Sequence, residues 1–213
     1  MPSALILIAE GTEESEFTIT YDVLVRGSVT TRSVLVGSSS TWSDASCAHS
    51  VAYVTCSRGV KIVPDLQLAD VGGGKALEYD CIVIPGGAKG VETISANADV
   101  QALVGAMYAK GKVVGAICAG SLAIHSAAIA RDSAITSHPS VKSSLDQHYA
   151  YKDDRVVVAD NLITSRGPGT TFEFALALLD ALVGKHNRLK IQPPMILHPS
   201  MSAHAQPEPD QLN

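Results

Sequence analysis

Short runs of apolar and β-branched residues recur along this chain and constrain its fold more than any other feature. Several of them are apolar without interruption, which is typical of strands covered on both faces of a sheet. Segments with helical character lie between them, at residues 98–110, 119–130 and 170–183. This alternation predicts an α/β layered fold with a mainly parallel sheet. The strand candidates read "ALILIA", "SVLVG", "VAYVT", "VKIVP", "CIVIPGG", "KVVGAI", "VVVAD" and "LITS".

The helical segments differ in how clearly their ends are marked. For residues 170–183, "GPG" precedes the helix, Thr170 and Glu173 fit a capping box, and Gly184 follows the apolar run. The segment 13–26 fits two structures, because its apolar residues alternate as in a strand while its first residues are acids that suit a helix N-terminus. The pattern alone leaves both open.

Length and composition indicate one folded domain. The chain has 213 residues, 46% of them hydrophobic and 17% charged, which is enough for one core. We expect a single domain over residues 1–197. The Ser-rich stretch 37–50 has no periodicity and is predicted to be a surface loop, and the polar residues 198–213 are predicted to form a disordered tail.

Charge and cysteine content argue against several classes of protein. The net charge is −5, and scattered Lys and Arg residues do not favour a nucleic-acid partner. The N-terminus lacks a basic leader and no stretch approaches the roughly 18 apolar residues of a membrane span, so we expect a soluble, cytoplasmic protein. The four cysteines form no C-x-x-C pair, which predicts free thiols and no metal site.

In a parallel sheet the ligand lies beyond the carboxyl ends of the strands, and Cys118 in "GAICAG" occupies such a position. Small residues, Ala116 and Gly120, flank it as in the nucleophile elbow, although that motif begins with Gly. A following helix N-terminus would lower the pKa of the thiol and make it nucleophilic. The alternative is a buried cysteine that acts as a small hydrophobe. These six residues do not decide between the two.

Other strand ends supply candidate partners for this thiol. The N–H groups of Gly87 and Ala119 could hold an oxyanion, unless "PGG" is an ordinary turn. If the segment 13–26 is helical, Glu16 falls on its apolar face, where burial would raise the pKa of the carboxyl. Its neighbours, Glu13 and Glu14, are expected to be solvated. His138 in "TSHPS" is a possible acid or base, or simply a polar surface residue.

Together these segments resemble the ThiJ/PfpI superfamily, and within it the parkinsonism-associated deglycase (DJ-one) branch. The motifs cover residues 4 to about 197 in the family's order, and "TSRGPGTTFEFALA" is the most specific. They read "GTEESE", "CSRGVKIVPD", "YDCIVIPGG", "AICAG", "SHP" and "TSRGPGTTFEFALA". The loop 37–50 is longer than is usual in the family, and the tail beyond residue 197 has no counterpart in it.

The resemblance implies a flavodoxin-like three-layer sandwich, a homodimer and no cofactor. It implies that Cys118 is the nucleophile, Glu16 the carboxyl bound to it and His138 the third member of the pocket, with Gly87 and Ala119 as backbone donors. Cys56 corresponds to a secondary oxidisable cysteine, and Cys81 is expected in the core. The residues implied at the pocket border or dimer interface are Asp22, Arg26, Arg58 and Pro168.

The resemblance also implies a function. We expect glutathione-independent detoxification of reactive dicarbonyls, either as a glyoxalase that converts methylglyoxal to lactate or as a protein deglycase, or both. The alternative is a redox sensor or chaperone-like dimer whose cysteine is oxidised to sulfinate. The protease branch is disfavoured because Ala119 stands where that branch has His, and class I glutamine amidotransferases are disfavoured because no His-x-Glu pair follows.

Overall fold

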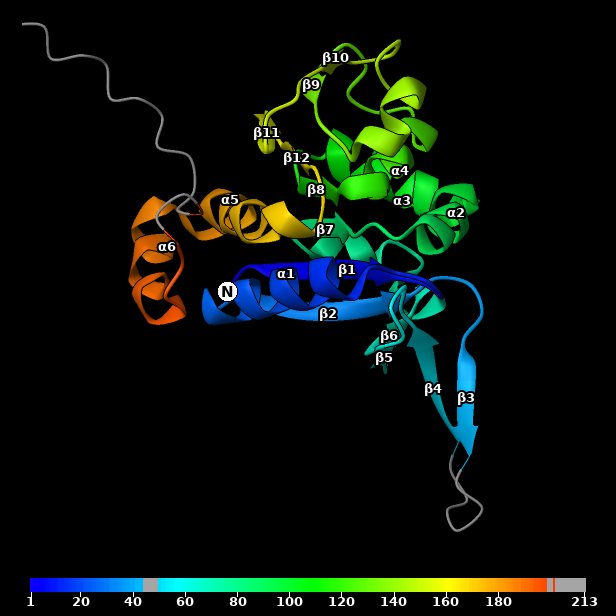
Figure 1. The fold of residues 1–213 in the computed structure, drawn as a ribbon. Coiled ribbons are helices and arrows are strands. Elements are labelled where there is room, and N and C mark those ends of the chain that lie inside the picture. The colour runs from blue at the N-terminus through cyan, green and yellow to red at the C-terminus, as the bar shows by residue number, and fades with distance from the viewer. Residues whose placement is uncertain (44–49, 199–200, 202–213) are drawn as a thin grey trace, which may run out of the picture.

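The computed structural model describes residues 1–43, 50–198 and 201, and a seven-stranded sheet lies at its centre (Figure 1). The strand order is β11-β12-β8-β7-β1-β2-β6, and every pair is parallel except β11 with β12. The carboxyl ends of β1, β7 and β8 therefore meet at one edge. The bounds are β1 Ser3–Ile8, β2 Thr30–Leu35, β6 Leu66–Gln67, β7 Cys81–Ile84, β8 Val113–Ile117, β11 Val156–Ala159 and β12 Leu162–Ser165.

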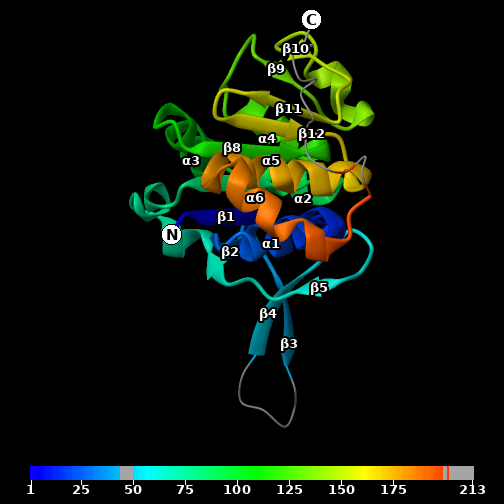
Figure 2. The same cartoon turned by 90° about the vertical axis from the view of Figure 1, so that its left-hand side faces the viewer.

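Helices cover both faces of this sheet, as Figure 2 shows. One hydrophobic cluster lies under α1 and α5, and the other lies under α2, α3 and α4. The flavodoxin-like sandwich expected from the sequence is confirmed. The helices are α1 Glu14–Arg26, α2 Ala88–Ala96, α3 Ala98–Ala109, α4 Ser121–Ser126, α5 Thr171–Val183 and α6 Lys185–Ile191, with 3-10 turns at η1 Leu68–Val71, η2 Lys75–Glu78, η3 Cys118–Gly120, η4 Pro139–Ser144, η5 Pro168–Thr170 and η6 Pro193–Met195.

The ambiguous segment 13–26 is a helix, α1. The Glu13 side chain caps it by accepting a hydrogen bond from the N–H of Ser15. Val23 and Leu24 are fully buried, whereas Val25 is 49% exposed, so burial follows the helical period and not the alternation of apolar residues. Packing against α5 decides the structure of this segment.

The stretch 37–50 is not simply a loop, as the sequence had suggested. Residues Ser40–Ser43 form strand β3, which pairs antiparallel with β4 (Ser50–Thr55), and the hairpin projects away from the sheet (Figure 1). Glu10 accepts hydrogen bonds from the N–H groups of Ser40 and Thr55 and thereby fixes its base. Residues 44–49 lie outside the described part, as do 199–200 and 202–213 of the expected tail.

Two further expectations about helix ends need correction. The predicted helix 119–130 is a 3-10 turn followed by the short α4, which ends at Ser126. The capping box of Thr170 and Glu173 is absent, because the Glu173 carboxylate binds Arg155 at 2.7 Å and the Thr170 hydroxyl bonds within the preceding turn. The Gly184 end is confirmed. Two small sheets complete the fold. One has the order β3-β4-β5, in which β5 (Lys61–Ile62) pairs with β4, and the other pairs β9 (Ala134–Ile135) with β10 (Ala150–Tyr151).

Candidate active site

Cys118 occupies a strained turn at the end of β8. Its φ is +63°, in the left-handed region that non-glycine residues rarely adopt. Such a conformation costs about 1–3 kcal/mol and persists only where the surrounding structure enforces it. The sharp turn expected of a nucleophile elbow is present, and it brings the thiol to the carboxyl edge of the sheet.

Two glycines allow this turn to pack against the end of β7. A Cβ at Gly120 would lie 2.3 Å from the carbonyl oxygen of Ile84, and a Cβ at Gly86 would lie 2.7 Å from the Cβ of Cys118. Neither distance is possible for real atoms, so both positions require glycine. The close approach leaves the Cys118 sulfur beside the backbone of the neighbouring strand end.

Glu16 is fully buried on α1 and reaches the same point. Its Oε2 accepts a 2.6 Å hydrogen bond from the N–H of Gly86, and its carboxyl interacts with the thiol of Cys118. Burial raises its pKa to about 7, and the charge of Glu13 adds to the rise, while the bonds to Gly86 and Cys118 oppose it. Near neutral pH this carboxyl can therefore either hold or release a proton.

The pKa of Cys118 is not lowered, in contrast to the expectation from the sequence. Burial, followed by the charge of Glu16, raises the pKa of this thiol to about 12. Hydrogen bonds from the N–H groups of Ala119 and Gly87 favour the thiolate but do not outweigh these effects. The short α4 provides only a weak N-terminal field. Since the like charges of thiolate and carboxylate oppose each other, the pair retains one proton, and a protonated Glu16 is what permits the thiolate.

Gly87 completes the group of backbone donors. It has a φ of +93° at the start of α2, and a Cβ there would lie 2.1 Å from the carbonyl oxygen of Gly11. Its N–H and that of Ala119 both bind the Cys118 sulfur. The two donors named from the sequence thus converge on one atom. Their use for an oxyanion stays a prediction.

His138 meets the cysteine through its backbone, since its N–H donates to the Cys118 carbonyl at 3.2 Å. Its ring Nδ1 accepts from the N–H of Ser140 at 3.2 Å, so a neutral ring carries its proton on Nε2. The ring borders a cavity of about 370 Å³ that Arg166 and Pro168 also line. His138 and Pro168 therefore share the border of this cavity.

The remaining candidates lie farther from the thiol. Asp22 and Arg26 form a 2.6 Å ion pair on the exposed face at the far end of α1 from Glu16. Arg58 is exposed, and its backbone N–H donates to Glu14 at 2.8 Å. Within the described chain these residues form surface interactions, and their role in a dimer stays a prediction.

Glu13 and Glu14 are buried, and the expectation that they are solvated is wrong. Ser57 Oγ lies 2.6 Å from Glu13 Oε2 and 2.9 Å from Glu14 Oε2. Burial alone would raise the pKa of Glu14, but its hydrogen bonds, including those from Ser57 and Arg58, hold that pKa below its ordinary value. These acids anchor the start of α1 to the turn after β4. No local signal could have shown this, because the partner is more than 40 residues away.

The other cysteines have surroundings that favour the thiol. Cys81 is fully buried in β7, as expected. Cys56 is 5% exposed, and burial, followed by the charges of Glu14, Glu13 and Glu10, raises its pKa to about 12. Cys47 lies outside the described residues. Among the described residues no group of three or more potential ligands is arranged to hold a metal ion.

Comparison with known proteins places these features in a family. The model of the DJ-1/PfpI family matches residues 2–181. Protein DJ-1alpha of Drosophila melanogaster is 42% identical over 184 residues, which cover 85% of this chain and 78% of the relative. A Caenorhabditis elegans protein named glutathione-independent glyoxalase DJR-1.2 is 38% identical over 197 residues, covering 92% of this chain and 96% of the relative.

Solved structures agree with the sequence comparison. The crystal structure of Drosophila melanogaster DJ-1beta superposes with a TM-score of 0.82 at 35% identity, covering 92% of this chain and 98% of that chain.

Across the residues that the structure describes, none of the helices combines the length and apolar character that a membrane span requires.

Proposed function

This chain belongs to the DJ-1/PfpI family, and we propose that it is a cofactor-independent, cysteine-dependent enzyme that acts on reactive dicarbonyls such as methylglyoxal. The name of the Caenorhabditis elegans relative supports this substrate class. One observation carries the proposal. The thiol of Cys118, whose backbone φ is +63°, lies beside the fully buried carboxyl of Glu16, whose pKa is about 7. Such a pair can exchange one proton at neutral pH.

The reaction begins at the sulfur of Cys118. Transfer of the thiol proton to Glu16 produces a thiolate that adds to the aldehyde carbon of methylglyoxal and forms a hemithioacetal. The N–H groups of Gly87 and Ala119 stabilise the charge that develops on oxygen. The substrate needs no redox partner, because one of its carbons is oxidised while the other is reduced.

Proton transfer between the two carbons completes the chemistry. Glu16 or His138 removes the proton from the former aldehyde carbon and a proton is returned to the former ketone carbon, which gives a thioester of lactate. Water then cleaves the thioester, releases lactate and restores the thiol of Cys118. The sum is methylglyoxal plus water to lactate.

Substitution of the nucleophile tests this proposal. We expect Cys118→Ser to abolish lactate formation from methylglyoxal without glutathione, a loss of at least about three orders of magnitude in kcat/KM. Cys56→Ser is the matched control, because Cys56 is buried outside the site, and it should retain turnover. Full activity of Cys118→Ser would refute the proposal.

A second substrate, a methylglyoxal-modified peptide, tests whether the enzyme is a lyase only or also a hydrolase. If the chain is also a deglycase, it acts on the adduct itself. It should then release the free amine from a methylglyoxal-modified peptide faster than that amine appears when free methylglyoxal is only removed from solution. Peptide and lactate are followed together by mass spectrometry, with a methylglyoxal trap present. Adduct loss that merely equals the trap-only rate would restrict the activity to that of a glyoxalase.

A redox role is the second candidate, favoured by the accessibility of Cys118. This thiol is partly exposed, whereas Cys56 and Cys81 are buried. A protonated Glu16 and the N–H of Gly87 can donate hydrogen bonds to the oxygens of a sulfinate. Mild peroxide should add two oxygen atoms selectively at Cys118, measured by intact mass and peptide mapping. Equal oxidation of all the thiols would argue against a sensor.

The proposed assembly is a homodimer in which Asp22 and Arg26 lie near the partner's pocket. Val25, which lies beside this pair on the surface of α1, is 49% exposed and offers apolar surface for such a contact. Light scattering after size exclusion gives the mass directly. A monomer at micromolar concentration would contradict this assembly and leave the single-chain site unchanged.

A further inference from the structure

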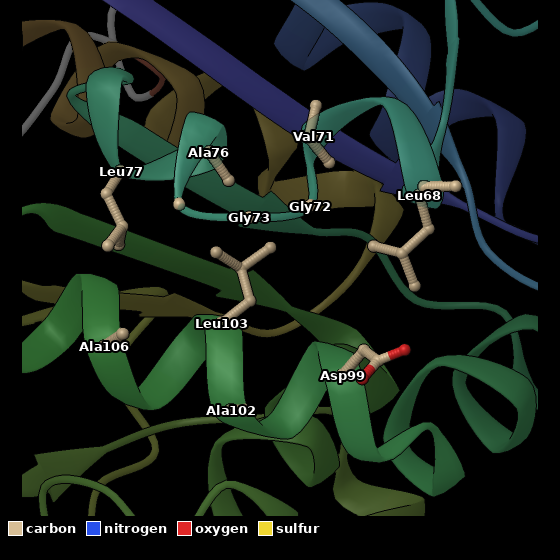
Figure 3. A pocket seen from close by; sticks show the side chains of 12 residues that line it. Leu68, Val71, Gly72, Gly73, Ala76, Leu77, Asp99, Ala102, Leu103 and Ala106 are labelled. Carbon is tan, nitrogen blue, oxygen red and sulfur yellow. The ribbon is translucent and has the colours of Figure 1, made fainter.

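A groove that plays no part in the proposed reaction lies between the η1–η2 segment and α3 (Figure 3). Its volume is about 450 Å³, within the range of small-molecule sites. It lies on the face of the sheet that α2, α3 and α4 cover, whereas α1, which carries Glu16, covers the other face. Any ligand in it would therefore be separate from the substrate of Cys118.

One face of α3 forms the floor of this groove. The residues on it are Asp99, Ala102, Leu103 and Ala106, whose spacing of three and four places them in a row along the helix. From the first to the last of them the helix rises about 10 Å. The small side chains of Ala102 and Ala106 leave the groove open on either side of Leu103 (Figure 3).

The opposite wall is apolar, and a single charge marks one end. Leu68 and Leu77 line the wall, and Figure 3 shows Asp99 near Leu68 while Ala106 lies near Leu77. Among the lining residues that the structure describes, Asp99 alone is charged. Its side chain is exposed and has no hydrogen bond or ion pair within the described part of the chain. The groove is thus apolar along its length with one free carboxylate at an end.

We propose that this groove is a second, non-catalytic ligand site for a small molecule that carries a primary ammonium group at one end of an apolar chain or ring about 10 Å long. The ammonium group pairs with Asp99, and the apolar part covers Leu103 and the two alanines. An ion pair at the surface contributes at most about fivefold in affinity, so apolar burial supplies most of the binding.

Titration of the full-length chain with octylamine, against 1-octanol as its neutral counterpart, tests this site. Amide chemical shifts in ¹H–¹⁵N spectra should move in η1, η2 and α3, and octylamine should bind about fivefold more tightly than 1-octanol. Asp99→Asn should remove that difference. Absence of shifts in these elements, or equal affinity for amine and alcohol in the wild type, would overturn the proposal.

Filling the groove gives an independent test. Ala106→Leu should weaken octylamine binding at least about tenfold, because the new side chain occupies the space of the ligand. Ala109→Leu is the matched control, since Ala109 lies on α3, is exposed and does not line the groove. If Ala106→Leu shows a lowered melting temperature, Ala102→Leu at an exposed position replaces it. Unchanged binding in the folded filling variant would refute the site, and methylglyoxal turnover should be the same in all of these variants.

Discussion

Cys118 and Cys56 both lie beside carboxyl groups near the start of α1, and burial raises the pKa of each thiol to about 12. They differ in what else surrounds the sulfur. At Cys118, N–H groups from Ala119 and Gly87 favour the thiolate, and the neighbouring Glu16 can take up a proton because its own pKa is about 7.

Among the described residues around Cys56, none makes such a compensating contribution. Burial and the charges of Glu14, Glu13 and Glu10 all act to keep its proton in place. Burial is therefore common to the proposed nucleophile, Cys118, and to Cys56. Backbone donors and a carboxyl with a raised pKa make the difference.

The largest expected effect is on the pH dependence of stability, and it comes from the carboxyl groups beside the two thiols. Folding raises the pKa of Glu16 from 4.5 to about 7, so the folded protein holds this proton more tightly than the unfolded chain. Relative to Glu16→Gln, the wild type should therefore lose about 3 kcal/mol of unfolding free energy as the pH rises from about 4.5 to 7, and lose no more above that. Urea unfolding at a series of pH values measures this.

Glu14 sharpens the comparison because its pKa is shifted in the opposite direction. Its contribution to stability is present above the pKa of an unfolded glutamate and is lost as the pH falls through its lower folded pKa. The difference between the wild type and Glu14→Gln should thus change with the opposite sign to that of Glu16→Gln. If the stability difference between the wild type and each variant changed with pH in the same direction, the opposite pKa shifts of Glu14 and Glu16 would be contradicted.

A smaller effect should separate the glycines at the two turns. Gly120→Ala places a Cβ 2.3 Å from a backbone oxygen and should cost roughly 2 kcal/mol or more. Gly59, after Cys56, has a φ of +98° but open space around it, so Gly59→Ala should cost only about 1 kcal/mol. Equal losses in denaturant unfolding would mean that the Cys118 turn is no more tightly packed than the other.

A further expected effect is on thiol reactivity. Iodoacetamide should alkylate Cys118 at least about tenfold faster than Cys56 at pH 7, and Glu16→Gln should lower the apparent pKa of that reaction because it removes a nearby negative charge. Peptide mapping over a pH series gives both rates. A Cys118 as slow as Cys56 would remove the distinction between the two sites.

Sequence patterns predicted the inner strands of the central sheet well, because β1, β7 and β8 are buried on both faces and their sequences are almost entirely apolar. They were less informative where tertiary contacts decide. The hairpin strand Ser40–Ser43 was missed because serines carry no apolar period, and its pairing is held by Glu10 from another part of the chain. The capping interaction of Glu173 was misassigned because Arg155, 18 residues earlier, binds that carboxylate.

The candidate site shows the same division. Cys118, Glu16 and Gly87 could be named because each follows a strand or falls on an apolar helical face. The sign of the thiol pKa shift could not be predicted, because it depends on how deeply the sulfur is buried and how close Glu16 lies to it. The burial of Glu14 could not be predicted either, because it depends on a turn distant in sequence.

The positive φ of Cys118 has a consequence for how this chain can vary. On conformational grounds glycine would suit the position better, by about 1–2 kcal/mol. As far as backbone conformation decides, selection for thermal stability alone should therefore favour Cys118→Gly, a substitution that deletes the sulfur atom that the proposed chemistry requires.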